Sequence, residues 1–262
     1  NILGGLVLAG ITGLVVIGGL KRIAEVATFL VPLMGSIYFG AMIIALVLNL
    51  NLVLPAFKLI LVDAFNGTAI AGGTFFGVLI YGVRRGAFSN EAGMGTESLV
   101  HGVAKVSNPV KQGLVAMTGP IFDTLIICTA TALMILVSGV WETSSSQGVT
   151  LTAEAFSILL GSFGGFILFT CVICFGLSTI FTYSYYGASC SRFLFGKFGM
   201  KFYIYLYILS IFIYSIVPID IAINIADGAF AMMAIPTLIS ALWLAPKVMQ
   251  ASRNYFKLID NN

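Results

Sequence analysis

The chain has 262 residues, of which 59% are hydrophobic and only 9% are charged, and its formal net charge is +3. A soluble domain carries about 25% charged residues, so this composition indicates an integral membrane protein. The positive charge is small and scattered along the sequence, which excludes a basic patch of the kind that binds nucleic acid.

Apolar runs of about 20 residues recur along the chain, and an α-helix needs that length to cross a hydrocarbon core of about 30 Å. A β-barrel would instead show alternating segments of about ten residues. The sequence therefore predicts an all-α membrane protein with about seven spans, at 3–20, 27–48, 72–104, 113–137, 155–187, 202–217 and 219–246. The third and fifth of these are so long that they must tilt, bend or break.

Lysine and arginine residues concentrate in alternate connections, near 21–25, 105–112 and 190–201, and again after the last span. The opposite connections contain Lys58. Because cytoplasmic loops carry the excess of Lys and Arg, this pattern places those three connections and the C-terminal end in the cytoplasm of a multi-pass cell-membrane protein.

The third predicted span contains the segment GVRRGAFSNEAGMG at 82–95. A charge held in the bilayer costs a few kcal/mol or more, so such a composition is unfavourable in a helix that faces lipid. A helix that is interrupted beside a polar cavity needs these residues, because its freed backbone can then bind a ligand. We therefore expect a break that produces two half-helices.

The two ends at such a break carry opposite partial charges. The carbonyl groups that end the first half-helix attract an ammonium group or Na⁺, and the N–H groups that begin the second attract a carboxylate. A zwitterionic amino acid satisfies both. The residues expected to bind it are Ser89 and Asn90, which can cap or coordinate, Gly93 and Gly95, which allow close approach, and Phe88, which can cover a methyl group.

Several residues of this region allow two interpretations. The glycines, Gly82 and Gly86 among them, also fit the close packing of a kinked helix. Arg85 and Glu91 can form a structural ion pair or take part in binding and coupling. Asp123, an ionisable residue inside the fourth predicted span, can pair with an arginine of the third span or couple transport to an ion.

The segment RRGAFSNEAGMG resembles the hallmark of the alanine or glycine:cation symporter family (AGCS), the sodium:alanine symporters. The similarity continues through VKQGLVAMTGPIFDTLIICTATALMIL, which begins at residue 110, the YYG at 185–187 and ADGAFAMMAIPTLIS at 226–240. It covers essentially the whole chain. The first broken helix of the family and its tyrosine-rich motif do not occur in this sequence. The chain therefore resembles a part of a longer protein, without that protein's N-terminal helices.

This family is similar in fold to the leucine transporter (LeuT), which has two inverted five-helix repeats around a central site. The resemblance implies that 1–49 forms the last two helices of the first repeat and 50–71 an extracellular interfacial segment. It implies that 72–247 forms the second repeat, broken at about 86–96, and that 248–262 is a cytoplasmic tail.

The resemblance also implies a sodium site on the fifth predicted span. Adjacent hydroxyls such as those of Ser178 and Thr179 ordinarily bond back to the preceding helical turn. In the LeuT template, paired hydroxyls at this position bind Na⁺ together with a carbonyl oxygen one turn earlier, here that of Phe175. Hydroxyl and carbonyl oxygens are the ligands that a hard cation prefers.

The expected function is Na⁺-coupled symport of a small neutral amino acid, alanine or glycine, by alternating access, with Na⁺ as coupling ion and no other cofactor. Two alternatives stay open. The same fold can use H⁺, carried by Glu91 or Asp123, or the chain can form a passive channel. The sequence contains no HExxH, GxSxG or paired catalytic aspartate pattern, so an enzyme is not expected.

Overall fold

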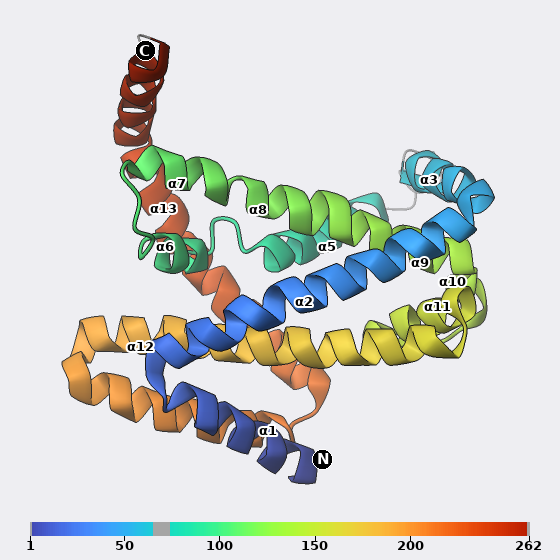
Figure 1. Ribbon diagram of the computed structural model, residues 1–262, viewed down its shortest axis with the longest axis horizontal. Coiled ribbons are helices and arrows are strands. Elements are labelled where there is room, and N and C mark those ends of the chain that lie inside the picture. Colours follow the sequence, from blue (N-terminus) through green and yellow to red (C-terminus); the bar gives the residue numbers. More distant parts are fainter. Residues whose placement is uncertain (1, 65–73, 261–262) are drawn as a thin grey trace. The chain divides into compact units, whose positions relative to one another are not determined.

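The computed structural model describes residues 2–64 and 74–260 (Figure 1), and within those ranges the chain consists of helices and their connections. The described helices form two compact units. Unit 1 comprises Asn1–Val78 and Ile127–Ile216, and unit 2 comprises Leu79–Ile126 and Val217–Asn262. Each unit thus joins two stretches that are far apart in the sequence.

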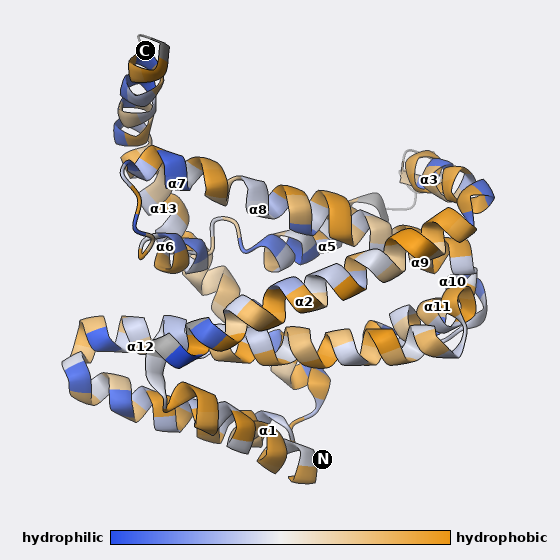
Figure 2. Cartoon of the chain, in the orientation of Figure 1, coloured by the Kyte–Doolittle hydropathy of each residue, from blue (hydrophilic) through white to orange (hydrophobic). Residues whose placement is uncertain are grey.

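Among the described residues, four helical segments are long and apolar enough to cross a membrane: Glu25–Leu48, Pro109–Ser138, Ser162–Tyr214 and Ile219–Ile259. Figure 2 shows hydrophobic residues along most of their length, with hydrophilic residues near the end of α5 and at the end of α13. A helix that is apolar around its surface is typical of a membrane span, because lipid rather than water surrounds it. The chain is therefore a helical membrane protein.

Unit 1 is built on long helices that pack side by side. Its elements are α1 (Ile2–Val16), α2 (Gly19–Leu48), α3 (Leu50–Ala64), α9 (Thr129–Ser138), α10 (Val140–Thr143), α11 (Val149–Leu160) and α12 (Ser162–Tyr214). α2 packs against α12, and α12 also packs against α1 and α11.

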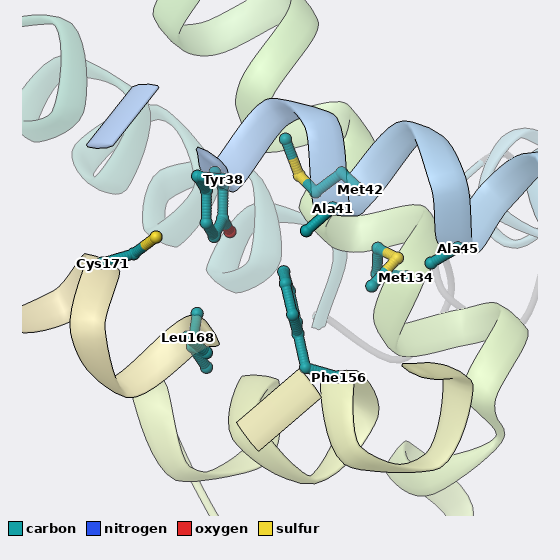
Figure 3. Packing of buried hydrophobic residues seen from close by; sticks show 8 residues of the cluster. All are labelled: Tyr38, Ala41, Met42, Ala45, Met134, Phe156, Leu168 and Cys171. Carbon is teal, nitrogen blue, oxygen red and sulfur yellow. The ribbon is translucent and has the colours of Figure 1, made fainter. Parts of the chain in front are cut away.

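The core of unit 1 lies where α2, α9, α11 and α12 meet (Figure 3). The ring of Tyr38 stacks on that of Phe156, with 5.5 Å between the centroids, and the Tyr38 hydroxyl lies 2.8 Å from Oγ1 of Thr131. Met42 and Met134 are fully buried beside them. This partner for the hydroxyl allows a tyrosine to be buried in an otherwise apolar core.

Two glycines divide the apolar stretch that runs from α11 through α12. Gly161 has φ 67° and separates α11 from α12, and Gly196 has φ 69° inside α12, where the chain turns back on itself (Figure 1). Both angles lie in the left-handed region that favours glycine. The predicted span at 155–187, which was expected to tilt, bend or break, is interrupted at Gly161. Its predicted end is wrong, because the helix that begins at Ser162 continues past residue 187.

Unit 2 contains most of the predicted binding residues. Its elements are α5 (Thr74–Asn90, from Leu79 onward), α6 (Thr96–His101), α7 (Pro109–Ala116), α8 (Thr118–Pro120), the first part of the π-helix η1 (Ile121–Cys128), and α13 (Ile219–Asp260). Asn108 caps α7 by accepting a hydrogen bond from the Val110 N–H at 2.9 Å, and Pro109 occupies the first turn, where a missing N–H costs nothing.

Some sequence predictions fall partly outside the described residues. These are residue 1, residues 65–71 of the predicted interfacial segment, residues 72–73 at the start of the third predicted span, and residues 261–262 of the predicted tail. The described part of the interfacial segment is helical and packs through Ala56 against Leu133 and Val137 of α9. The described part of the tail continues α13 without interruption.

Candidate functional site

The hydrophilic segment of the third predicted span is interrupted between α5, which ends at Asn90, and α6, which begins at Thr96. Three of the five residues in between have positive φ: 55° at Glu91, 80° at Gly93 and 90° at Gly95. Two of these positions are glycines, for which the left-handed region is free of strain, whereas a non-glycine residue such as Glu91 is uncommon there. Gly93 and Gly95 thus stand where the backbone leaves the right-handed helical conformation.

The second half-helix is shorter than predicted. α6 has six residues and ends at His101, where a turn at Gly102 follows. It does not reach residue 104, the predicted end of the span. The field of a helix dipole builds up over successive aligned peptides, so six residues supply little of it. Attraction of an anion at this break therefore depends on individual N–H groups and side chains.

The carboxyl end of α5 is attached to η1 by hydrogen bonds. Ser89 Oγ donates to Asp123 Oδ2 at 2.5 Å, and Asn90 Nδ2 donates to Thr124 Oγ1 at 3.2 Å. The side-chain oxygen of Asn90, Oδ1, accepts from the Ala92 N–H at 3.0 Å, inside the break. Two residues predicted to bind substrate and the predicted coupling residue Asp123 are thus brought together at one point.

Two arginines of α5 converge on one carboxylate of α13. Arg84 forms an ion pair with Asp227, and Nη2 of Arg85 lies 3.4 Å from the same carboxylate oxygen. The Asp227 side chain is 2% exposed, and its Oδ1 is buried without a hydrogen-bond partner among the described residues. Opposite charge nearby stabilises a buried carboxylate, and the two guanidinium groups supply it.

Arg85 also connects this ion pair to the aromatic residues near the break. Its guanidinium carbon lies 5.2 Å from the ring centroid of Tyr81 and 6.0 Å from that of Phe88. The Phe88 ring meets Phe230 of α13 edge to face, with 4.4 Å between the centroids. Contacts of this kind restrict the rotamers of Phe88.

A cavity of about 630 Å³ lies between α5 and α13. Its lining is mainly apolar and includes Phe88, Met94 and Phe230, with Arg84, Asn224 and Asp227 as its polar members. Binding pockets for small molecules measure about 300–1,000 Å³ and combine apolar walls with a few polar groups. The cavity is thus of a size and composition that suit a small polar ligand.

The glycines of the break lie close to α13. A Cβ atom at Gly95 would be 2.8 Å from Thr237 Oγ1, and one at Gly93 would be 3.4 Å from Leu238 Cδ2. Next to them Thr96 is 1% exposed, and its hydroxyl has no hydrogen-bond partner within the described part of the chain. A buried hydroxyl without a partner is unfavourable unless a ligand or water satisfies it.

The residues predicted to bind Na⁺ belong to α12 in unit 1. Ser178 is buried, and its Oγ donates to the carbonyl oxygen of Phe175 at 2.9 Å, while Thr179 is exposed. This is the ordinary bond of a helical serine to the preceding turn. It places one hydroxyl and one carbonyl oxygen next to each other, which are two of the three ligands that the resemblance implies.

Sequence reasoning did not assign a site role to Thr96, Thr124 or Phe230, whereas Asp227 was, like Asp123, a candidate for an ion pair or a functional role. Asp227 was recognisable as an ionisable residue within an apolar stretch, but its arginine partners lie 142 and 143 residues earlier in the chain. Thr96 and Thr124 carried no signal, because threonine is common in membrane helices.

Comparisons with known proteins agree with the helical membrane architecture. The chain matches the model of the sodium:alanine symporter family over residues 1–262. It is 37% identical to an uncharacterised transporter, YflA, of Bacillus subtilis (strain 168), and the match covers 98% of this chain and 56% of that relative. It is 35% identical to the sodium/alanine symporter AgcS of Methanococcus maripaludis, covering 98% of this chain and 57% of the relative.

A third relative is the probable sodium/glutamine symporter GlnT of B. subtilis (strain 168), which is 33% identical over 96% of this chain and 53% of its own length. The chain thus spans about half the length of the curated relatives it matches. The family consists of transporters, in agreement with the expectation that the chain is not an enzyme. On this evidence the chain belongs to the sodium:alanine symporter family.

Proposed function

We propose that this chain is part of a Na⁺-coupled symporter that imports a small neutral amino acid, alanine or glycine, by alternating access. The observation that carries the proposal is the helix break at residues 91–95, with three positive φ angles and polar side chains inside an apolar region. In membrane transporters, interrupted helices of this kind bind the substrate near the middle of the bilayer.

The break offers separate partners for the two charges of an amino acid. The backbone N–H groups of Gly93, Gly95 and Thr96 and the amide of Asn90 are assigned to the carboxylate. The N–H groups of Ala92 and Met94 already donate, to Asn90 Oδ1 and to the carbonyl oxygen of Glu91. Asp123 and the hydroxyl of Ser89, which are already hydrogen-bonded to each other at 2.5 Å, are suited to an ammonium group. Gly93 and Gly95 let the ligand approach the backbone closely.

Selection of a small side chain is assigned to the aromatic wall of the cavity. Phe88 and Phe230 contact each other there, and Met94 lies beside them. Phe88 lies three residues before the break, where it can cover the methyl group of an alanine bound at residues 91–95 and crowd the longer side chain of glutamine. The relatives AgcS and GlnT are named for alanine and glutamine respectively, so glutamine is the informative competitor.

The coupling ion is assigned to Phe175, Ser178 and Thr179 on α12. The proposal also includes the architecture of the protein. This chain forms seven spans of a LeuT-like bundle with inverted repeats, and its connections near 21–25, 105–112 and 190–201 are cytoplasmic. Na⁺ and substrate then stabilise the same conformation, so each raises the affinity of the protein for the other.

The test is uptake of radiolabelled alanine by proteoliposomes that contain the full-length protein. With an inward Na⁺ gradient at equal pH, alanine should accumulate above its external concentration, and replacing external Na⁺ by K⁺ should abolish the accumulation. Unlabelled glycine should compete more strongly than glutamine. Equilibration without accumulation would show a passive channel and contradict the proposal.

Proton coupling is the second candidate, because the carboxylate of Asp123 lies within the site and can carry H⁺. A pH gradient without Na⁺ would then drive accumulation in the same vesicles. That result would replace Na⁺ as the coupling ion while leaving the substrate site unchanged.

A further inference from the structure

The last part of α13 differs in character from the rest of that helix. The apolar segment that precedes Pro246 is followed by Lys247, Arg253 and Lys257, and no acidic residue occurs between Lys247 and Ile259. In Figure 1 this final part of α13 runs in a different direction from the part before it, and in Figure 2 hydrophilic and hydrophobic residues alternate along it. Proline inside a helix is a common cause of such a bend.

The length of α13 shows that this end lies outside the hydrocarbon core. The whole helical segment Ile219–Ile259 has 41 residues, which corresponds to about 60 Å at 1.5 Å per residue. This is twice the core thickness of about 30 Å. The cations identify the C-terminal end as the part in the headgroup region. Trp243, 81% exposed and shortly before the bend, is of the type that gathers at this boundary.

A groove of about 560 Å³ lies along this part of α13. Its apolar lining comes before or at the start of the basic segment, from Leu242, Ala245, Pro246 and Met249. Its polar lining begins directly after Met249 and consists of Gln250, Arg253, Asn254 and Lys257. The groove is thus apolar on the side of the membrane and basic on the side of the headgroups.

The spacing of the polar residues places their side chains on one face of the helix. Arg253 and Lys257 are four residues apart, and Gln250 and Asn254 are also four apart, so each pair is separated by about one turn. Two cations at this spacing can contact one phosphate. The amides of Gln250 and Asn254 can donate to the polar groups around it.

We propose that this groove binds an anionic phospholipid. Its phosphate contacts Arg253 and Lys257, and one of its acyl chains lies on Leu242, Pro246 and Met249. The charge complementarity and the order of apolar and basic residues along the helix both match a lipid that lies with its head toward the aqueous side. This site is separate from the helix break and does not depend on what the protein transports.

The experiment measures binding of phosphatidylglycerol and phosphatidylcholine to the delipidated full-length protein by native mass spectrometry. Each cation near an anionic lipid contributes about fivefold to the binding constant, so Arg253→Gln with Lys257→Gln should weaken phosphatidylglycerol binding about 25-fold. Phosphatidylcholine binding should not change. The charge-preserving pair Arg253→Lys with Lys257→Arg should retain most of the affinity.

The matched control is Lys105→Gln with Lys111→Gln, which removes two exposed cations from another part of unit 2. It should bind phosphatidylglycerol as the unchanged protein does, and equal loss in both double variants would overturn the site. Competition by inorganic phosphate would also overturn it, because that would show a phosphate site without a lipid. If the Gln variant is not monodisperse, salt near 1 M, where the screening length is about 3 Å, must still selectively weaken phosphatidylglycerol binding to the unchanged protein.

Discussion

Replacement of Gly95 by alanine should strongly impair the conformation of the helix break. Gly95 has φ 90°, and an added Cβ would lie 2.8 Å from the hydroxyl oxygen of Thr237. A non-glycine residue in the left-handed region costs about 1–2 kcal/mol, which corresponds to about a 5- to 30-fold smaller population of the broken conformation. The contact with Thr237 adds to that cost.

The assay is Na⁺-driven alanine uptake by the full-length protein at an alanine concentration below KM, with the amount of inserted protein measured in parallel. Gly95→Ala should reduce the uptake rate at least about fivefold. Adding Thr237→Ala removes the close oxygen but not the backbone strain, so it should restore only part of the rate.

Gly86→Ala is the matched control for this prediction. Gly86 lies within α5, and nothing within 4 Å would meet an added Cβ there. Alanine is favoured over glycine in a helix by about 1 kcal/mol, so this variant should be inserted and active. Equal activity of the Gly86 and Gly95 variants would refute the argument that the positive φ at the break is required.

Three further variants test other parts of the site. Asp227→Asn should destabilise the protein by about 1–3 kcal/mol, because two partly exposed arginines lose their counter-charge. The measurement is the melting temperature, which should fall. An unchanged melting temperature would contradict the role given to this ion pair. Asp123→Asn keeps an acceptor for Ser89 but removes the charge proposed to face the ammonium group, so KM for alanine should rise about tenfold, and an unaltered KM would remove Asp123 from the site. Ser178→Ala with Thr179→Ala should raise the Na⁺ concentration for half-maximal uptake about tenfold, and the same Na⁺ dependence as the unchanged protein would exclude this cation site.

The helix break could be predicted from the sequence because its requirements are local. A backbone that leaves the helix needs residues that tolerate positive φ and side chains that satisfy freed polar groups. Gly93, Gly95, Ser89 and Asn90 provide both within a few positions. The extent of α6 was not predictable in the same way, because an apolar continuation after His101 looks the same whether the helix ends or goes on.

The residues that contact the break could not be predicted from the sequence, because they come from distant elements. Asp123 and Asp227 stood out as ionisable residues in apolar surroundings, but nothing local shows that one contacts Ser89 and the other Arg84 and Arg85. Contacts of this kind depend on how α13 and η1 pack against α5.

Two irregularities in other helices could not be located from the hydropathy of the chain. Gly161 ends α11 within an apolar run that contains further glycines, so its positive φ could not be singled out. The π-helical turns at Ile121–Cys128 have the composition of an ordinary membrane helix. Hydropathy reports the solvent that a segment faces and is insensitive to the local backbone path.

The most direct test of the account is a structure of the full-length protein with alanine and Na⁺ bound. The account predicts that alanine lies beside residues 91–95, with its carboxylate within hydrogen-bond distance of a backbone N–H there and its ammonium group near Ser89 or Asp123. Alanine bound elsewhere, with an unbroken helix from Val83 through Thr96, would contradict it.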